Sequence, residues 1–289
     1  HMRDLNYQLK ELCRKNRDGS YATQAQRFSI LMLMANQLHE LGYRQMTAQS
    51  LKPKHVEALT RHWLKADLAI ATIKNRMSVL RWWAEKVGRQ NVIARSNDHY
   101  GIPDRQYVTN VSKAQSVNED ALRSIPDAHV RMSLELQQAF GLRREEAIKF
   151  IPSYADRGDH MVLKDTWTKG GKAREIPVRT AAQRDVLDRA HRLAGRGSLI
   201  PAHLMYIQQV RIYEGQTAGA GLSKMHGLRH AYAQQRYFEL TGWACPAANG
   251  PRSRAMTEEQ KTRDREARLT ISQELGHERE EITAIYLGR

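Results

Sequence analysis

Near its end the sequence carries a histidine and a tyrosine, His277 and Tyr286, that are nine positions apart. On an unbroken helix nine steps of about 100° amount to roughly 900°, so the two side chains would face opposite sides. Both residues can serve one site only if the backbone bends between them. The alternative is an ordinary surface helix whose Ile282, Ile285 and Tyr286 pack inward at helical spacing.

Arginine occurs in two motifs that place a second polar residue three positions away. Arg143 precedes Glu146, and His226 precedes Arg229. Residues at this spacing share one face of a helix, where a carboxylate can hold a guanidinium group in a single rotamer. The first motif therefore predicts an arginine in a defined orientation, and the alternative is an exposed ion pair on a solvated helix.

A β-hairpin is predicted for residues 159–178. Their side chains alternate with the period of a strand, the chain turns at a pair of glycines, and residues 174–178 form the returning strand. Lys169 and Lys172 then lie near the tip of the hairpin. A lysine at such a tip is usually solvated, although it is also well placed to reach into a groove.

The charge of the chain indicates a polyanionic partner. The 289 residues carry a formal net charge of +15, and the pI is near 10.0. Residues 1–97 hold 17 Lys and Arg against 7 Asp and Glu, so this third is the most basic part. Nucleic acid is the usual partner of such a protein, and the alternative is a basic protein that is merely soluble.

Composition also excludes several classes of protein. Hydrophobic residues make up 41% of the chain, enough to fill a core and too many for a disordered chain. Cys13 and Cys245 are too few for a disulfide framework and lack the spacing of a metal site. No apolar run approaches the roughly 18 residues of a membrane span, and no secretory signal is visible. We expect a cytoplasmic protein without a membrane partner or a bound metal.

The first part of the chain is expected to be a bundle of four helices. Apolar residues recur at helical spacing over 5–12, 22–41, 53–63 and 72–87. Residues 96–111 are rich in polar and turn-forming residues, which indicates a linker. We therefore expect one domain at 1–95 and a second at 112–289.

One face of the fourth helix is basic. Basic residues along a helix suit phosphate contacts or insertion into a groove of DNA, but they form ordinary solvated faces equally often. If the partner is DNA, the candidate contacts are Lys74, Arg76 and Arg81 on this helix and Lys172 on the hairpin.

The second part of the chain surrounds the hairpin with further helices. They are predicted at 129–140, 181–193, 204–213, 225–240 and 257–273. Residues 242–256 are rich in Gly, Pro, Ala and Ser and form a predicted loop. The expected fold class is mainly α with a small β-sheet (α+β).

Taken in order, these motifs resemble the tyrosine recombinase (phage integrase) family, in particular the integrases of mobile elements. The order of the motifs and the interval between His277 and Tyr286 both fit the pattern of that family. The helical first part is similar in type and position to the core-binding domain of the family, and residues 112–289 to its catalytic domain. The residues that carry the resemblance are Arg143, Glu146, Lys169, His226, Arg229, His277 and Tyr286.

The resemblance implies a DNA strand transferase that forms a 3′-phosphotyrosyl intermediate. Tyr286 would be the nucleophile, and Lys169 would be the general acid that protonates the departing 5′ oxygen. Arg143 and Arg229 would hold the negative charge of the scissile phosphate as phosphorus becomes five-coordinate. Glu146 would orient Arg143.

The same resemblance implies the remaining roles and partners. His226 and His277 would donate hydrogen bonds to the phosphate or help to move the tyrosine proton. Because a phosphodiester is exchanged for a phosphotyrosine of similar energy, no cofactor is expected. The implied partners are double-stranded DNA, further copies of the chain in a tetramer on DNA, and DNA-bending accessory proteins. The reaction would integrate or excise a mobile genetic element in the bacterial cytosol.

The sequence departs from the family pattern in two places. Arg229 and His277 are 48 positions apart, more than in the compact members of the family, and the excess falls within 242–270. Only three residues follow Tyr286, where family members often continue into a segment that docks on a neighbouring protomer. Either the chain continues beyond this sequence, or protomers couple through another element such as 242–270.

Three alternatives remain open on the sequence. Lys172 competes with Lys169 for the role of general acid, and the position of Lys169 just before the glycine pair favours it. A catalytically silent DNA-binding protein of the same fold would have no need for Tyr286. A nicking and closing enzyme similar to type IB topoisomerases would use the same chemistry without pairing two DNA sites.

Overall fold

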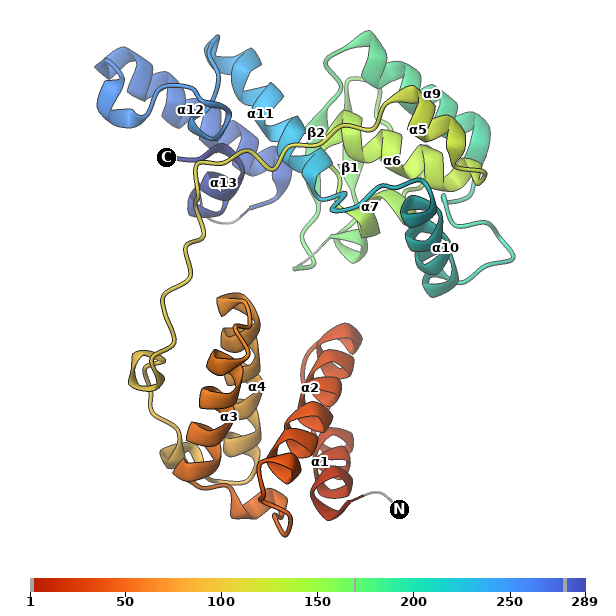
Figure 1. Cartoon of the computed structure of the whole chain (residues 1–289). Coiled ribbons are helices and arrows are strands. Elements are labelled where there is room, and N and C mark those ends of the chain that lie inside the picture. The colour runs from red at the N-terminus through yellow and green to blue at the C-terminus, as the bar shows by residue number, and fades with distance from the viewer. Residues whose placement is uncertain (1–2, 169, 278–279) are drawn as a thin grey trace. The chain divides into compact units, whose positions relative to one another are not determined.

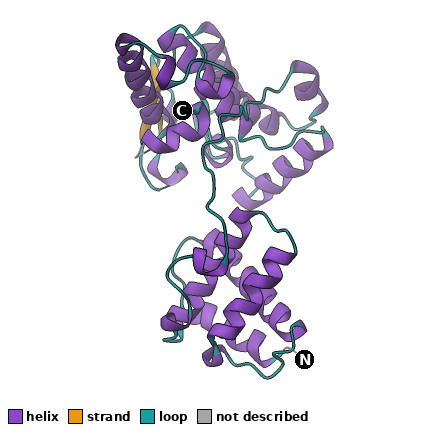
Figure 2. Ribbon diagram, turned by 60° about the vertical axis from the view of Figure 1, so that its left-hand side comes forward, coloured by secondary structure: helices purple, strands orange, loops and turns teal. Residues whose placement is uncertain are grey.

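The computed structural model of the protein describes residues 3–168, 170–277 and 280–289. Helices dominate, and two short strands form a single sheet among these residues, which confirms the expected fold class (Figures 1 and 2). The chain divides into two compact units, His1–Gln106 and Tyr107–Arg289. The division falls between residues 106 and 107, inside the stretch whose composition indicates a linker.

The described residues of the first unit contain four α-helices (Figure 1): α1 (Asp4–Lys15), α2 (Tyr21–Glu40), α3 (Pro53–Lys65) and α4 (Ile70–Lys86). Ser20 caps α2 by accepting a hydrogen bond from the backbone N–H of Thr23. Pro53 begins α3 at a position where a missing N–H costs nothing. Trp63 on α3 and Trp83 on α4 are completely buried and join the aliphatic side chains in the core of this unit.

The second unit contains one hairpin and nine helices in the described residues. These elements are α5 (Glu119–Ser124), α6 (Ala128–Phe140), α7 (Arg144–Ile148), α8 (Pro152–Ala155), β1 (His160–Leu163), β2 (Arg174–Pro177), α9 (Ala181–Ala194), α10 (Tyr206–Gly219), α11 (Gly227–Thr241), α12 (Glu258–Leu275) and α13 (Glu280–Leu287). Helix α11 packs against α6, α12 and α13, and α12 also packs against β2. Segments far apart in the sequence therefore meet around α11.

The strands of the hairpin are shorter than the alternating pattern predicts. β1 and β2 pair antiparallel, with His160 opposite Pro177 and Leu163 opposite Arg174. The chain then forms a 3₁₀ turn over Asp165–Trp167, where the alternation predicted a continuing strand. The reason is the burial of Trp167, whose ring packs against neighbouring aromatic side chains and is only 5% exposed.

Helix α12 ends in a left-handed turn at Gly276. Gly276 ends α12 in the left-handed region at φ 66°, a conformation that a residue with a side chain adopts at a cost. A Cβ atom at this position would also lie 2.8 Å from Cδ of Arg174. Helix α12 therefore ends at this turn, and α13 is a separate helix. His277 and Tyr286 do not lie on one unbroken helix, so their side chains need not face opposite sides.

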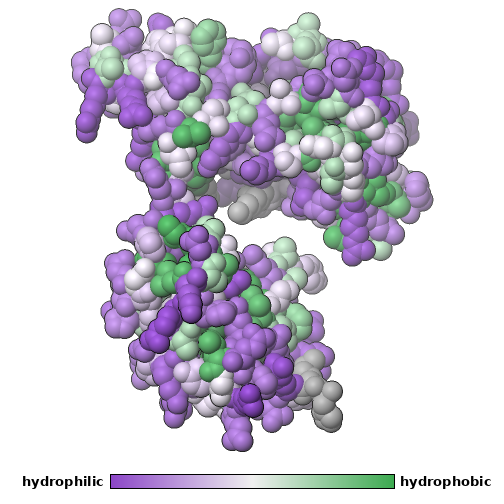
Figure 3. Space-filling model, in the orientation of Figure 1, coloured by the Kyte–Doolittle hydropathy of each residue, from purple (hydrophilic) through white to green (hydrophobic). Residues whose placement is uncertain are grey.

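The face of the molecule drawn in Figure 3 is mainly hydrophilic, with hydrophobic residues scattered among polar ones. The apolar residues instead gather in the interiors of the two units. None of the helices in the described part of the chain is long and apolar enough to cross a membrane.

Candidate active site

Arg229 is the buried centre of the candidate site. It lies in the first turn of α11, its side chain is 0% exposed, and its Nη1 donates a hydrogen bond of 2.6 Å to the carbonyl oxygen of Gly141. Its Nη2 donates to the carbonyl oxygen of Leu275, at the end of α12. Burial, and then the charge of Arg143, lower the pKa of Arg229 to about 10. The guanidinium group therefore remains a cation at neutral pH.

Arg143 and Glu146 meet, but not on one face of a helix as their spacing predicted. Arg143 is the N-cap residue of α7, so its backbone is extended rather than helical. The carboxylate of Glu146 reaches back to it, and Oε2 accepts the backbone N–H of Arg143 at 2.7 Å. Oε1 accepts Nη1 of the same arginine at 2.8 Å. Glu146 thus fixes both the backbone and the side chain of Arg143.

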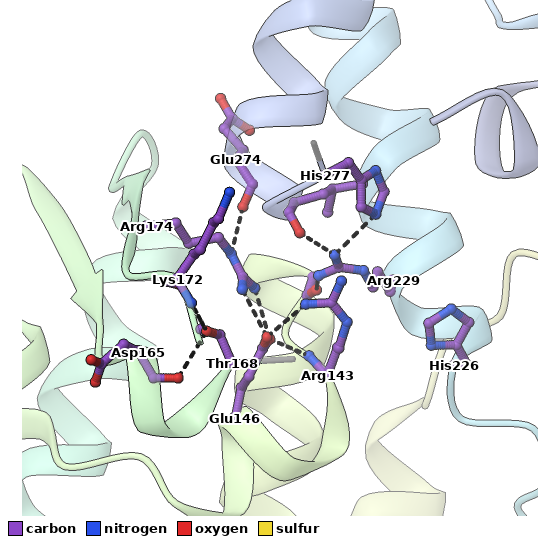
Figure 4. A network of polar contacts seen from close by, with 12 residues as sticks. Arg143, Glu146, Asp165, Thr168, Lys172, Arg174, His226, Arg229, Glu274 and His277 are labelled. Atoms are coloured by element: carbon purple, nitrogen blue, oxygen red, sulfur yellow. Dashed lines mark hydrogen bonds and ion pairs between the residues drawn. The ribbon is translucent and has the colours of Figure 1, made fainter. Parts of the chain in front are cut away.

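A second arginine, which the sequence analysis did not single out, holds the other side of Glu146 (Figure 4). Nη1 and Nη2 of Arg174 each donate a 2.7 Å hydrogen bond to the carboxylate, and Nε donates one of 2.9 Å to the carbonyl oxygen of Glu274. A charged residue on the same strand face as the buried Ile176 is the signal that could have revealed it.

Glu146 is fully buried yet charged. Burial alone would raise the pKa of its carboxyl group, but the hydrogen bonds and charge of Arg174, followed by the charges of Arg229 and Arg143, lower the pKa to about 2. One buried carboxylate therefore organises the guanidinium groups of Arg143 and Arg174 as a cationic cluster.

The hydroxyl group of Tyr286 lies against His226 and Arg229. Its oxygen is 3.0 Å from Nε2 of His226, the N-cap residue of α11, and accepts a 3.4 Å hydrogen bond from Nε of Arg229. The side chain of Gln234 donates a hydrogen bond of 3.1 Å to the backbone carbonyl oxygen of Tyr286. Residues of α11 thus hold both the side chain and the backbone of Tyr286, which is only 6% exposed.

Two further histidines flank the ring of Tyr286. The ring of His277 stacks on it with centroids 5.3 Å apart, and Nε2 of His277 is 3.4 Å from Nη2 of Arg229. Nδ1 of His277 is 3.0 Å from the hydroxyl oxygen of Thr283, in α13. The ring of His230, one turn beyond His226, is 4.4 Å from that of Tyr286, and the sequence analysis did not single it out either.

All three histidines are shifted toward the neutral form. Burial, and then the charge of Arg229, lower the pKa of His277 to about 3 and also lower that of His226. Burial, followed by His226, lowers the pKa of His230 to about 4. In the chain alone, the imidazoles around Tyr286 are therefore neutral at pH 7 and can accept protons.

An open cavity of about 1970 Å³ adjoins these groups. Its lining includes Arg143, Lys172, Arg174, His226, His277 and Tyr286. The hydroxyl oxygen of Thr168 accepts the backbone N–H of Lys172 at 3.1 Å and donates to its carbonyl oxygen at 2.6 Å, which positions this lysine beside the cavity. Lys169 lies outside the described residues.

The basic residues of α4 lie in the first unit and contact their own chain. Lys74 forms a salt bridge of 3.0 Å with an exposed aspartate. Arg81 donates hydrogen bonds to residues 94–97, which tie the segment after α4 to the helix. The guanidinium carbon of Arg76 lies 5.5 Å from the ring centroid of Trp63.

Two models of protein families match the chain. The one described as "Phage integrase, N-terminal" matches residues 2–93, and the one described as "Integrase" matches residues 103–235. Together the matches span most of the sequence, and the chain belongs to the phage integrase family of tyrosine recombinases. No curated protein sequence matches it significantly.

Solved structures of that family share the fold. A lambda integrase dimer bound to a COC′ core site superposes with a TM-score of 0.63 at 15% identity, covering 99% of this chain and 78% of that one. XerH recombinase bound to palindromic difH, a post-cleavage complex, superposes with a TM-score of 0.59 at 17% identity. The match covers 98% of this chain and 81% of that one. The Tn1549 transposon integrase in complex with circular intermediate DNA superposes with a TM-score of 0.57 at 13% identity. The match covers 100% of this chain and 96% of that one.

Proposed function

We propose that this chain is a site-specific DNA recombinase that integrates or excises a mobile genetic element by cleaving and rejoining DNA strands. The observation that carries the proposal is the position of the Tyr286 hydroxyl group, 3.0 Å from His226 and 3.4 Å from Arg229, beside a cavity that Arg143 also lines. A nucleophile, a neutral proton acceptor and two cations suited to a phosphate group then share one site.

The proposed cleavage step joins Tyr286 to DNA. The phenol oxygen attacks the scissile phosphorus, the bond from phosphorus to the 5′ oxygen breaks, and a 3′-phosphotyrosyl link forms. The phenol proton passes to Nε2 of His226. Arg143 and Arg229 stabilise the charge that develops on the non-bridging oxygens. Attack by a 5′ hydroxyl group of another strand reverses these bonds and completes the exchange.

The departing 5′ oxygen needs a proton from a general acid. We propose Lys169 for this role from its place beside the glycine pair of the hairpin, with Lys172 as the competing candidate because it lines the cavity. His277 would donate a hydrogen bond to the phosphate after its ring moves away from Tyr286. Glu146 would keep Arg143 oriented throughout.

The proposed partners are double-stranded DNA, further copies of the chain in a tetramer on DNA, and DNA-bending accessory proteins. The net charge of +15 supports the first of these. In the first unit, which would be the core-binding domain, Lys74, Arg76 and Arg81 remain proposed DNA contacts. Arg81 also donates hydrogen bonds to residues 94–97, so it would contact DNA from a side chain that this segment already holds in place.

A suicide substrate, nicked so that the cleaved end diffuses away, tests the proposal. The site is first found by footprinting the chain on DNA from the source genome. The native chain should form a denaturation-resistant adduct with the nicked duplex, and Tyr286→Phe should form none while binding the duplex equally well. An adduct that persists with Tyr286→Phe would exclude this tyrosine as the nucleophile.

Two further measurements separate the proposal from its rivals. A catalytically silent DNA-binding protein would form no adduct with any duplex it binds. A topoisomerase-like enzyme would relax a plasmid that carries two sites without producing recombinants, whereas a recombinase produces them. Under all three hypotheses the affinity for duplex DNA should fall steeply as the salt concentration rises, because each neutralised phosphate releases a counterion.

A further inference from the structure

The helix that carries Tyr286 is held at both of its ends. α13 has only eight residues, and a helix of this length is unstable in isolation because nucleation is costly. Near its beginning, the hydroxyl group of Thr283 is within 3.0 Å of His277. Beyond its end, the carbonyl oxygen of Gly288 accepts a 2.9 Å hydrogen bond from Nη1 of Arg268, which is buried at 7% exposure.

Arg268 is itself fixed by a polar network in α11 and α12. Its Nε donates hydrogen bonds of 2.9 Å to both carboxylate oxygens of Asp264, one turn earlier in α12. The hydroxyl group of the fully buried Tyr237 donates a 2.5 Å hydrogen bond to the same carboxylate. Tyr237 in turn accepts a 3.3 Å hydrogen bond from the indole N–H of Trp243. This network therefore gives Arg268 a single orientation, aimed at the backbone beyond α13.

A second contact holds the next residue of the chain. The side-chain oxygen of Asn110 accepts the backbone N–H of Arg289 at 2.7 Å. Asn110 has φ 52° and Gly288 has φ 76°, so both lie in the left-handed region. A Cβ atom on Gly288 would lie 2.5 Å from Oδ1 of Asn110 and 2.7 Å from the backbone nitrogen of Ala247. Gly288 thus lets the backbone enter a space too narrow for any side chain.

We propose that Arg268 and Asn110 are positioning residues that clamp the backbone of Gly288 and Arg289 and thereby keep the phenol of Tyr286 in the arginine site. Tyr286 lies only two residues before Gly288, so freeing this backbone lets the last turn of α13 unwind and carries the phenol away. The inference rests on the proposed function for its catalytic consequence. It also assigns a role to residues 242–270, since both Asp264 and Arg268 belong to that stretch.

Amide hydrogen exchange tests the clamp whether or not the chain cleaves DNA. With Arg268→Ala, exchange in α13 should become about ten- to a hundredfold faster, as expected for the loss of a hydrogen bond to a charged group. Exchange in α6 should not change. The matched control is Arg265→Ala, which removes an exposed arginine from the same helix and should leave α13 unchanged. Unaltered exchange of α13 in Arg268→Ala would overturn the proposal.

The rate of adduct formation at saturating DNA tests the catalytic consequence. Arg268→Ala should lower this rate about ten- to a hundredfold with little change in the Kd for DNA, because the phenol occupies the site less often. If Arg268→Ala fails to fold, Asn110→Gly serves instead, since glycine retains the positive φ and removes the side chain whose oxygen accepts the N–H of Arg289. If the native chain forms no adduct, the proposed function is refuted and the positioning role is judged by hydrogen exchange. If the native chain and the folded variant form adduct at equal rates, the positioning role is refuted.

Discussion

Nε2 of His226 lies 3.0 Å from the hydroxyl oxygen of Tyr286, although sixty positions separate the two residues. Both belong to one chain, and both adjoin the buried guanidinium group of Arg229. A neutral imidazole at this distance can accept the phenol proton as the phenol attacks. The contact places the proposed nucleophile, the proposed proton acceptor and Arg229 together within a single protomer.

The first prediction concerns the pH dependence of cleavage. Burial, and then the charge of Arg229, lower the pKa of His226 below its ordinary value of 6.5, so this imidazole stays neutral until the pH falls further. At sub-saturating DNA, where rates report the free chain, adduct formation should hold steady from about pH 8 down to about pH 6.5 and fall only below that. A rate already halved at pH 6.5 would contradict the role of His226 as proton acceptor. In His226→Gln the remaining rate should no longer fall with protonation of this imidazole.

The second prediction is that Tyr286 attacks within its own protomer. Arg143→Ala retains the tyrosine but lacks one arginine, and Tyr286→Phe retains the arginines but lacks the nucleophile. A mixture of these two chains on the suicide substrate should form no more adduct than either alone, because no single protomer is complete. Strong restoration of adduct in the mixture would instead show that the tyrosine is delivered to a neighbouring protomer.

The third prediction is a large loss of stability when Arg174 is removed. Arg174→Ala would leave the buried carboxylate of Glu146 with one arginine in place of two, and breaking a buried pair in this way typically costs about 3–5 kcal/mol. Urea unfolding measures the change. Arg123→Ala, which breaks an ion pair whose arginine is 70% exposed, should have little effect. Equal effects of the two substitutions would argue against the Glu146 cluster.

The fourth prediction links His230 to stability in acid. Its pKa is about 4 in the folded chain and near 6.5 when unfolded, so between these values the unfolded state binds more protons. The free energy of unfolding should therefore fall as the pH drops from about 6.5 to about 4, by up to about 1.4 kcal/mol per pH unit for one histidine.

His230→Phe keeps a ring against Tyr286 and removes the titrating group. This variant should show a shallower loss of stability over the same pH range, measured by urea unfolding at each pH. His277, with a pKa of about 3, contributes a slope of the same sign and remains in both chains. An unchanged slope in His230→Phe would show that this histidine is not buried in its neutral form.

Much of the local structure follows from periodicity and turn chemistry. The four helices of the first unit, the hairpin, and the helices on either side of it are all visible as apolar spacing in the sequence. Where the pattern misled, tertiary packing was the cause. The strand predicted through Asp165 gives way to a 3₁₀ turn because Trp167 is buried. The alternative of a surface helix with Ile282 packed inward also fails at this residue, which is 39% exposed.

By itself the sequence determined which chemical groups the chain possesses, their order, and the family to which they point. Only the tertiary structure decided that Arg174 contacts Glu146 across 28 positions and Glu274 across 100. Helical spacing describes neighbours within about one turn, whereas contacts between distant segments depend on how helices pack and where the backbone turns. The turn at Gly276 is the clearest case, since it brings Tyr286 onto Arg229 from a helix that spacing alone would have directed elsewhere.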